Sequence, residues 1–163
     1  MKRERATIDD PDDADAAEAA ALRILAGAAQ AASALERRLR QRGFSLSAVR
    51  SAVARCRELG YIDDSALATS VVTRQQRAGH GRSRAVLDLR RRGVSSAAAA
   101  DALAGFDEEQ EQEAANRAAQ DLYDRELKRG RIDQRVSQRV GAALQRRGFA
   151  AGVIVRALRS VRT

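Results

Sequence analysis

The chain has 163 residues, is 44% hydrophobic and 3% aromatic, and carries 30 lysines and arginines against 22 acidic residues, for a net charge of +8. This length fits one domain or a short array of small modules. The sequence has no apolar run long enough to span a membrane, and its acidic start is unlike a signal peptide. We therefore expect a soluble, cytoplasmic protein whose basic surface binds polyanions or acidic proteins. The alternative is a solvated arginine-rich surface that binds nothing.

The beginning of the chain is acidic, whereas the rest is basic. Residues 1–18 hold three bases and seven acids. We expect residues 1–15 to form a disordered acidic tail. A helical stretch is expected next over Ala19–Ala32, with Leu22 and Leu25 on one face.

A short phrase then occurs three times, each copy consisting of a leucine, three mostly basic or polar residues, a glycine and a bulky apolar residue. The glycines of the three copies lie 50 and 55 residues apart, at Gly43, Gly93 and Gly148. A period of this length is typical of a repeat protein. Basic residues in a last turn followed by glycine indicate the end of a helix.

Further helices are expected on both sides of the phrase. Ser45 and Ser95 follow the first two glycines at positions where each can cap a new helix. Before the second and third copies lie helical stretches over Ser65–Arg77 and Glu108–Arg129, the latter capped by Asp107. Each unit therefore contains three helices.

The sequence predicts an all-α fold of three tandem three-helix repeats. Nothing in it indicates strands, because alternating β-branched runs are absent. After the acidic tail, the repeats are expected at residues 16–60, 61–106 and 107–163. A unit of this size buries little surface alone, so neighbouring repeats should pack together.

The sequence shows no signature of an enzyme or a metal protein. Cys56 and His80 are the only cysteine and histidine, so a disulfide within the chain is excluded and a metal site lacks ligands. The segment Gly79–Ser83 is rich in glycine but lacks the lysine and the spacing of a nucleotide-binding loop. We expect no catalytic activity, no metal and no cofactor.

Two helices joined by a glycine-containing turn also fit a DNA-reading helix-turn-helix motif. The second helix would then need side chains that reach base edges. Residues 95–103 offer only serine, alanine, aspartate and leucine, although the first repeat has Arg50, Arg55 and Arg57. Base-specific reading by all three repeats is therefore not expected, and nonspecific nucleic-acid binding is the alternative function.

Arginines recur at matching places in the repeats. At about 100° per residue, Arg84 and Arg91 lie close together on the side of their helix opposite Leu89. Arg139 and Arg146 occupy the same offsets in the third repeat, and Arg37 lies nearby in the first. The spacing predicts a row of arginines along one edge of the repeats.

Several segments together resemble the RecX family of bacterial regulatory proteins, from about Ala21 to Val161. The central signature is carried by Gly60–Asp64, Gly81–Arg84 and Leu89–Val94, and the N-terminal portion by Ala21–Leu25, Leu35–Leu39 and Gly43–Phe44. The third repeat matches least well.

The resemblance implies an elongated, curved, basic array of three three-helix repeats. It also implies a partner, the RecA protein in filaments on single-stranded DNA, whose ATPase, strand-exchange and co-protease activities RecX proteins suppress. A weak contact with DNA, a monomeric state and a role in regulating DNA repair and the SOS response are further implications.

We expect the partner contacts at arginines that the repeats bring into register. These are Arg84, Arg91 and Arg92 centrally, flanked by Arg82, Arg37, Arg40 and Arg146. The residues expected to serve the structure are Gly43, Gly93, Gly148, Gly60, Tyr61, Asp63 and Asp64, with Tyr61 packing between repeats.

Overall fold

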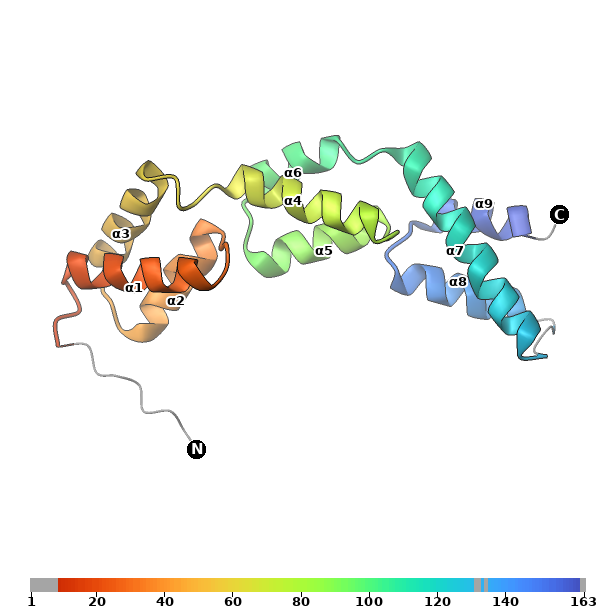
Figure 1. Cartoon of the computed structure of the whole chain (residues 1–163), viewed down its shortest axis with the longest axis horizontal. Coiled ribbons are helices and arrows are strands. Elements are labelled where there is room, and N and C mark those ends of the chain that lie inside the picture. The colour runs from red at the N-terminus through yellow and green to blue at the C-terminus, as the bar shows by residue number, and fades with distance from the viewer. Residues whose placement is uncertain (1–8, 131–132, 134, 162–163) are drawn as a thin grey trace, which may run out of the picture. The chain divides into compact units, whose positions relative to one another are not determined.

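A computed structural model describes residues 9–130, 133 and 135–161 of the chain. These residues form nine α-helices and no strand, in three consecutive groups of three (Figure 1). The all-α fold predicted from the sequence is thus confirmed. Among the described residues, no helix combines the length and the apolar character that crossing a membrane requires.

The first group comprises α1 (Ala14–Gly27), α2 (Ala32–Arg42) and α3 (Leu46–Glu58). Its core holds Leu35 and Leu39 of α2 with Val49, Val53 and Cys56 of α3, all at most 2% exposed, and the alanines of α1 pack against them. Small alanines let the helices approach closely, which offsets the scarcity of aromatic residues.

The helix expected over Ala19–Ala32 begins and ends about one turn earlier. Asp13 caps α1 by accepting a hydrogen bond from Ala16 N at 2.8 Å, and the helix ends at Gly27, after which Ala28 is extended. The run from Ala28 to Ala32 contains four alanines and a glutamine. Because alanine carries no stop signal, periodicity could not place this break.

The acidic segment is in part fixed to the first repeat. Pro11 O accepts a hydrogen bond from Ser45 N at 2.8 Å, and Asp12 Oδ1 accepts one from Ser47 Oγ at 3.3 Å. The disordered tail expected over residues 1–15 therefore overlaps a segment that contacts the start of α3 and enters α1. Residues 1–8 of that expected tail lie outside the described residues.

The second group comprises α4 (Asp64–Arg77), α5 (Arg82–Arg92) and α6 (Ser96–Ala104). The third comprises α7 (Glu108–Lys128), α8 (Val136–Arg146) and α9 (Ala151–Val161). In the third group, Val140 and Leu144 of α8 pack with Phe149 and the alanines of α7. Asp107 caps α7 as predicted, accepting from Glu109 N at 2.8 Å and Gln110 N at 3.0 Å.

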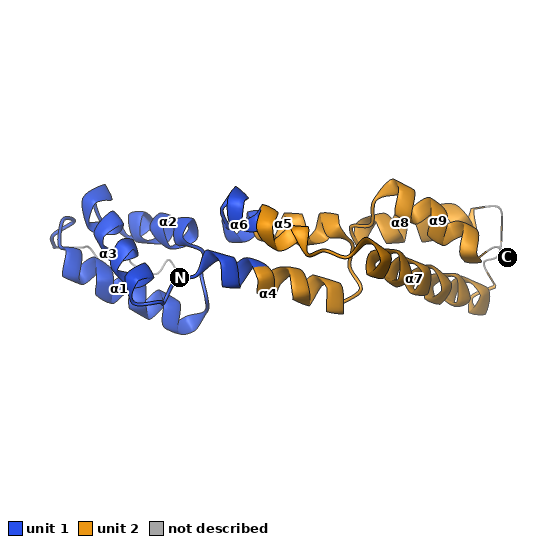
Figure 2. Ribbon diagram, turned by 90° about the horizontal axis from the view of Figure 1, so that it is seen from above, with its two compact units in different colours: residues 1–68, 90–99 blue, residues 69–89, 100–163 orange. Residues whose placement is uncertain are grey.

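By density of contacts the chain divides into two compact units, although its helices fall into three groups (Figure 2). Unit 1 comprises residues 1–68 and 90–99, and unit 2 comprises residues 69–89 and 100–163. The helices of the second group are therefore shared between the two units. Each unit contains one complete three-helix group and part of the second.

The predicted helix endings are confirmed. Gly43, Gly93 and Gly148 have φ of 107°, 74° and 85°, in the left-handed region that side chains avoid. The hydroxyls of Ser45 and Ser95 accept from Ala48 N and Ala98 N, each at 3.3 Å, and so cap the following helices.

Candidate functional site

The N-terminus of α5 is held by groups from the third repeat. Gly81 N donates to Arg147 O at 3.0 Å and Ser83 N donates to Gly148 O at 3.1 Å. Arg82 N donates to the carboxylate of Glu111 at 2.8 Å, and Glu111 is only 7% exposed. Three backbone N–H groups that a helix start leaves without partners are thereby satisfied.

The N-terminus of α2 has a related arrangement with the second repeat, in which the hydroxyl of Ser33 replaces the backbone N–H of Ser83 as the donor. Ala32 N donates to Asp64 Oδ1 at 2.9 Å, and Ser33 Oγ donates to Gly93 O at 2.7 Å. Ala32 and Ser33 stand 50 residues before Arg82 and Ser83. We call these two sets of contacts the α2 junction and the α5 junction.

The junctions give two of the three repeat glycines, Gly93 and Gly148, a second role, which sequence reasoning missed. A Cβ added at Gly93 would lie 2.5 Å from Ser33 Oγ, and one added at Gly148 would lie 2.5 Å from Arg84 N. The serine at position 33 supplies its hydroxyl to the α2 junction, but Ser83 supplies only its backbone N–H to the α5 junction, so no side-chain signal in the sequence was common to both. Glu111 gave no signal either, because it stands in a run of acidic residues.

The central arginines of the predicted surface differ in their surroundings. The side chains of Arg84 and Arg91 on α5 are exposed, whereas Arg92 is half-buried. Arg82 Nη1 donates to Leu103 O at 2.8 Å and so ties α5 to the end of α6. Arg82 therefore has a structural role in joining α5 to α6, in addition to the partner contact predicted for it.

The flanking arginines line shallow surface grooves. Arg37 and Arg40 on α2 border a groove of about 420 Å³ together with Ser33, Glu36 and Gln41. Arg146 on α8 borders a second groove, of about 370 Å³, between α7 and α8. The alignment of the arginines along one edge of the repeats stays a prediction.

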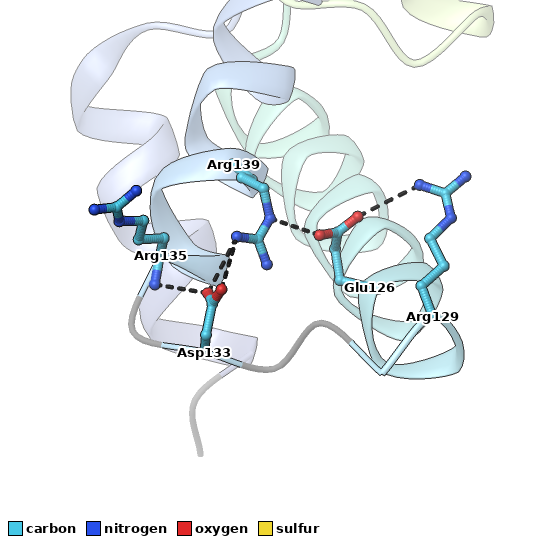
Figure 3. Close-up of polar contacts among 5 residues, drawn as sticks. All are labelled: Glu126, Arg129, Asp133, Arg135 and Arg139. Atoms are coloured by element: carbon cyan, nitrogen blue, oxygen red, sulfur yellow. Dashed lines mark hydrogen bonds and ion pairs between the residues drawn. The ribbon is translucent and has the colours of Figure 1, made fainter.

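Arg139, which matches Arg84 in sequence offset, lies among acidic groups. Its Nε donates to Glu126 at 2.6 Å, and its Nη1 contacts Asp133 at 3.1 Å (Figure 3). The hydrogen bond to Glu126 is the largest cause that raises the pKa of Arg139, and the contacts with Asp133 add to it. The third repeat therefore does not copy the exposed arginine of α5 at this position.

The Gly60–Asp64 motif forms the start of α4. Gly60 has φ of 75°, and Asp63 caps the helix by accepting from Ala66 N at 2.8 Å. The packing role expected for Tyr61 is wrong, since Tyr61 is 56% exposed and its neighbour Ile62 is 6% exposed. The aromatic ring is the more conspicuous signal in the sequence, but the aliphatic side chain enters the core.

Cys56 and His80, the single cysteine and histidine of the sequence, do not belong to a cluster of metal-ligating side chains among the described residues. Burial raises the pKa of the Cys56 thiol, and the nearby charge of Glu18 adds to this effect. His80 contacts Gln75 Oε1 through Nδ1 at 2.7 Å. Burial is the largest cause that lowers the pKa of His80, and the positive charges of Arg84 and Arg147 lower it further. Within the described part of the chain, no group of three or more His, Cys, Asp or Glu could hold a metal ion.

Comparison with known proteins identifies relatives over most of the chain. A protein of Streptomyces coelicolor named Regulatory protein RecX is 32% identical over 141 residues, which cover 85% of this chain and 73% of the relative. The protein of the same name from Mycobacterium leprae is 33% identical over 135 residues, covering 82% and 78% of the two chains. No established family profile matches the chain.

Two solved structures share the fold. The crystal structure of RecX from Lactobacillus salivarius superimposes with a TM-score of 0.79 over 92% of this chain and 97% of the other, at 20% identity. A second crystal structure of regulatory protein RecX gives a TM-score of 0.74 over 88% and 70% of the chains, at 25% identity. The sequence relatives and the shared helical architecture agree, and the chain belongs to the RecX family of regulatory proteins.

Proposed function

We propose that this protein binds the RecA filament on single-stranded DNA and inhibits the activities of RecA. The observation that carries the proposal is membership of the RecX family, together with exposed arginines on the second helix of each repeat. The protein acts by binding rather than by catalysis.

The exposed arginines supply the chemistry for such a contact. Arg84 and Arg91 on α5, Arg37 and Arg40 on α2 and Arg146 on α8 all project into solvent. A guanidinium group forms paired hydrogen bonds with carboxylates and phosphates, which a protein filament on DNA presents. Arg92 and Arg82 belong to the same proposed surface, with Arg82 also bonded to Leu103 O.

Repetition suits a filament as partner. A filament offers equivalent sites at a fixed spacing, and three homologous repeats offer equivalent helices. Because contacts held in one chain act at high effective concentration, several weak contacts combine into a much tighter one. The junctions on α2 and α5 fix the helices that carry the arginines, which reduces the entropy lost on binding.

The test is the DNA-dependent ATPase of RecA, measured against increasing concentrations of this protein. We expect inhibition by the unmodified protein at modest stoichiometry. For the double variant Arg84→Glu and Arg91→Glu we expect the concentration for half-inhibition to rise about tenfold, since exposed charge pairs contribute weakly one by one. The matched control is Arg23→Glu, an exposed arginine on α1 outside the proposed surface.

The outcomes separate the family role from the contact surface. Absence of inhibition by the unmodified protein would remove the RecA proposal altogether. Equal inhibition by the double variant and the control would retain RecA but discard this surface. Direct binding to DNA without RecA, with a steep dependence on salt, would instead favour the nonspecific nucleic-acid function.

A further inference from the structure

A second basic feature lies in the third repeat, between α7 and α8. The groove of about 370 Å³ is lined by apolar side chains, which we call its floor, by four arginines, which we call its rim, and by Glu126. The floor residues are Leu122, Val140, Ala142 and Ala143, and the rim residues are Arg125, Arg129, Arg139 and Arg146. Leu122 is half-buried and Val140 is 2% exposed. We call it the α7–α8 groove. It combines an apolar surface with a concentration of positive charge.

Two of the rim arginines are held in place by one carboxylate. Glu126, whose side chain is 12% exposed, accepts from Arg139 Nε at 2.6 Å and pairs with Arg129 Nη1 at 3.4 Å. Figure 3 shows the Glu126 side chain between these two guanidinium groups, with Asp133 on the far side of Arg139. These pairs orient the guanidinium groups, and Glu126 and Asp133 offset only part of the charge of the four arginines, so the described residues leave the groove with a net positive charge.

The other two rim arginines have no such partner. Among residues 9–130, 133 and 135–161, no carboxylate forms an ion pair with Arg125 or Arg146, and both side chains are exposed. Guanidinium groups of this kind can form paired hydrogen bonds with an incoming carboxylate. The fold thus presents two uncommitted arginines and two that are already oriented around one apolar floor.

The floor decides what kind of anion fits. Sites for single-stranded nucleic acid combine basic residues with aromatic side chains on which bases stack. The side chains that the structure places around this groove include no aromatic ring. An aliphatic floor instead buries an aliphatic side chain, and the volume lies in the range of small ligand pockets.

We propose that the α7–α8 groove binds an acidic peptide segment of a protein partner, with carboxylates on the rim arginines and an aliphatic side chain on the floor. The proposal goes beyond the inhibition of RecA, because the groove adds Arg125, Arg129 and Arg139 to the surface discussed above. The proposal does not depend on RecA being the partner, because its test measures binding of a synthetic acidic peptide.

The test measures binding of a short fluorescein-labelled peptide that alternates glutamate with leucine, by fluorescence anisotropy against the full chain. Two matched peptides replace all glutamates by glutamine or all leucines by serine, and labelled oligothymidylate reports nucleic acid. We expect the glutamate–leucine peptide to bind most tightly. Arg125→Glu combined with Arg146→Glu should weaken it about tenfold, whereas Arg23→Glu should not.

Folding is monitored separately, by circular dichroism of each variant. Arg125 and Arg146 are exposed, so their substitution should leave the helix content unchanged. Peptide binding that survives the double substitution overturns the proposal. Equal affinity for the glutamate–leucine peptide and for the peptide with serine in place of leucine also overturns it. Oligothymidylate that binds more tightly than the peptide and is lost in the double variant would make the groove a nucleic-acid site instead.

Discussion

Replacing Gly148 by alanine should destabilise the protein more than the same change at Gly60. Both glycines are in the left-handed region, with φ of 85° and 75°. A Cβ at Gly60 would meet nothing within 4 Å, so the cost there is backbone strain alone. A Cβ at Gly148 would lie 2.5 Å from Arg84 N and 2.7 Å from Arg84 Cβ. The pair of variants therefore separates strain from the contact at the α5 junction.

The magnitudes follow from these two terms. Left-handed backbone costs a non-glycine residue roughly 1–2 kcal/mol, and this applies at both sites. Overpacking adds about 1–3 kcal/mol, and only at Gly148. Relief would require moving the start of α5 away from α8, which breaks the bonds from Gly81 N to Arg147 O and from Ser83 N to Gly148 O. We expect Gly148→Ala to cost about 2 kcal/mol more than Gly60→Ala.

The assay is thermal and urea unfolding, followed by far-ultraviolet circular dichroism. A difference of about 2 kcal/mol corresponds to a Tm lower by about 4–8 °C in a chain of this size. Both variants make the same chemical change, so effects on the unfolded chain largely cancel in the comparison. Gly93→Ala should fall between them, because its Cβ meets Ser33 Oγ, a hydroxyl that can rotate away at the loss of one hydrogen bond. Equal destabilisation at Gly60 and Gly148 would refute the close approach at the α5 junction.

Further outcomes follow from Glu111 and Cys56, which are buried, and from His80, which is half-buried. Glu111→Ala should lower the free energy of unfolding by about 1.5–3 kcal/mol, because Arg82 N loses a charged acceptor. Glu111→Gln should retain much of this free energy, because its amide oxygen still accepts from Arg82 N. Equal losses in the two variants would contradict the role of Glu111 as the acceptor. Because the pKa of folded His80 is lowered, its neutral form adds stability that is present above about pH 6.5 and lost as the pH falls below it. The stability difference between wild type and His80→Asn should therefore change across that range, and a constant difference would exclude the effect. Cys56, buried and with a raised pKa, should react with iodoacetamide far more slowly in the folded protein than in urea, and equal rates would show that the thiol is exposed.

The sequence by itself determined the features that depend on neighbouring residues. Glycine at 43, 93 and 148 takes the left-handed conformation, and Ser45, Ser95 and Asp107 cap the helices that follow. Such signals are local, because a cap or a left-handed turn is satisfied within a few residues. Their recurrence at a fixed period was enough to predict three groups of three helices.

The tertiary structure decided the exposure and the partners of side chains that stand at equivalent positions of the repeats. Arg84 is exposed, whereas Arg139 at the matching offset pairs with Glu126 and Asp133. Asp133 stands just before α8 in the sequence, but Glu126 lies on α7 and only folding brings it beside α8. The break between α1 and α2 likewise lies in an alanine-rich run that is equally able to continue a helix.

The junctions and the α7–α8 groove have the same origin. Ala32 N meets Asp64, and Arg82 N meets Glu111, across sequence separations of 32 and 29 residues. Nothing in the chain around a carboxylate indicates which distant N–H group it will accept from, since that choice is made by the packing of whole helices. The sequence determined which helices form and where their ends lie, and the fold determined which polar groups those ends meet.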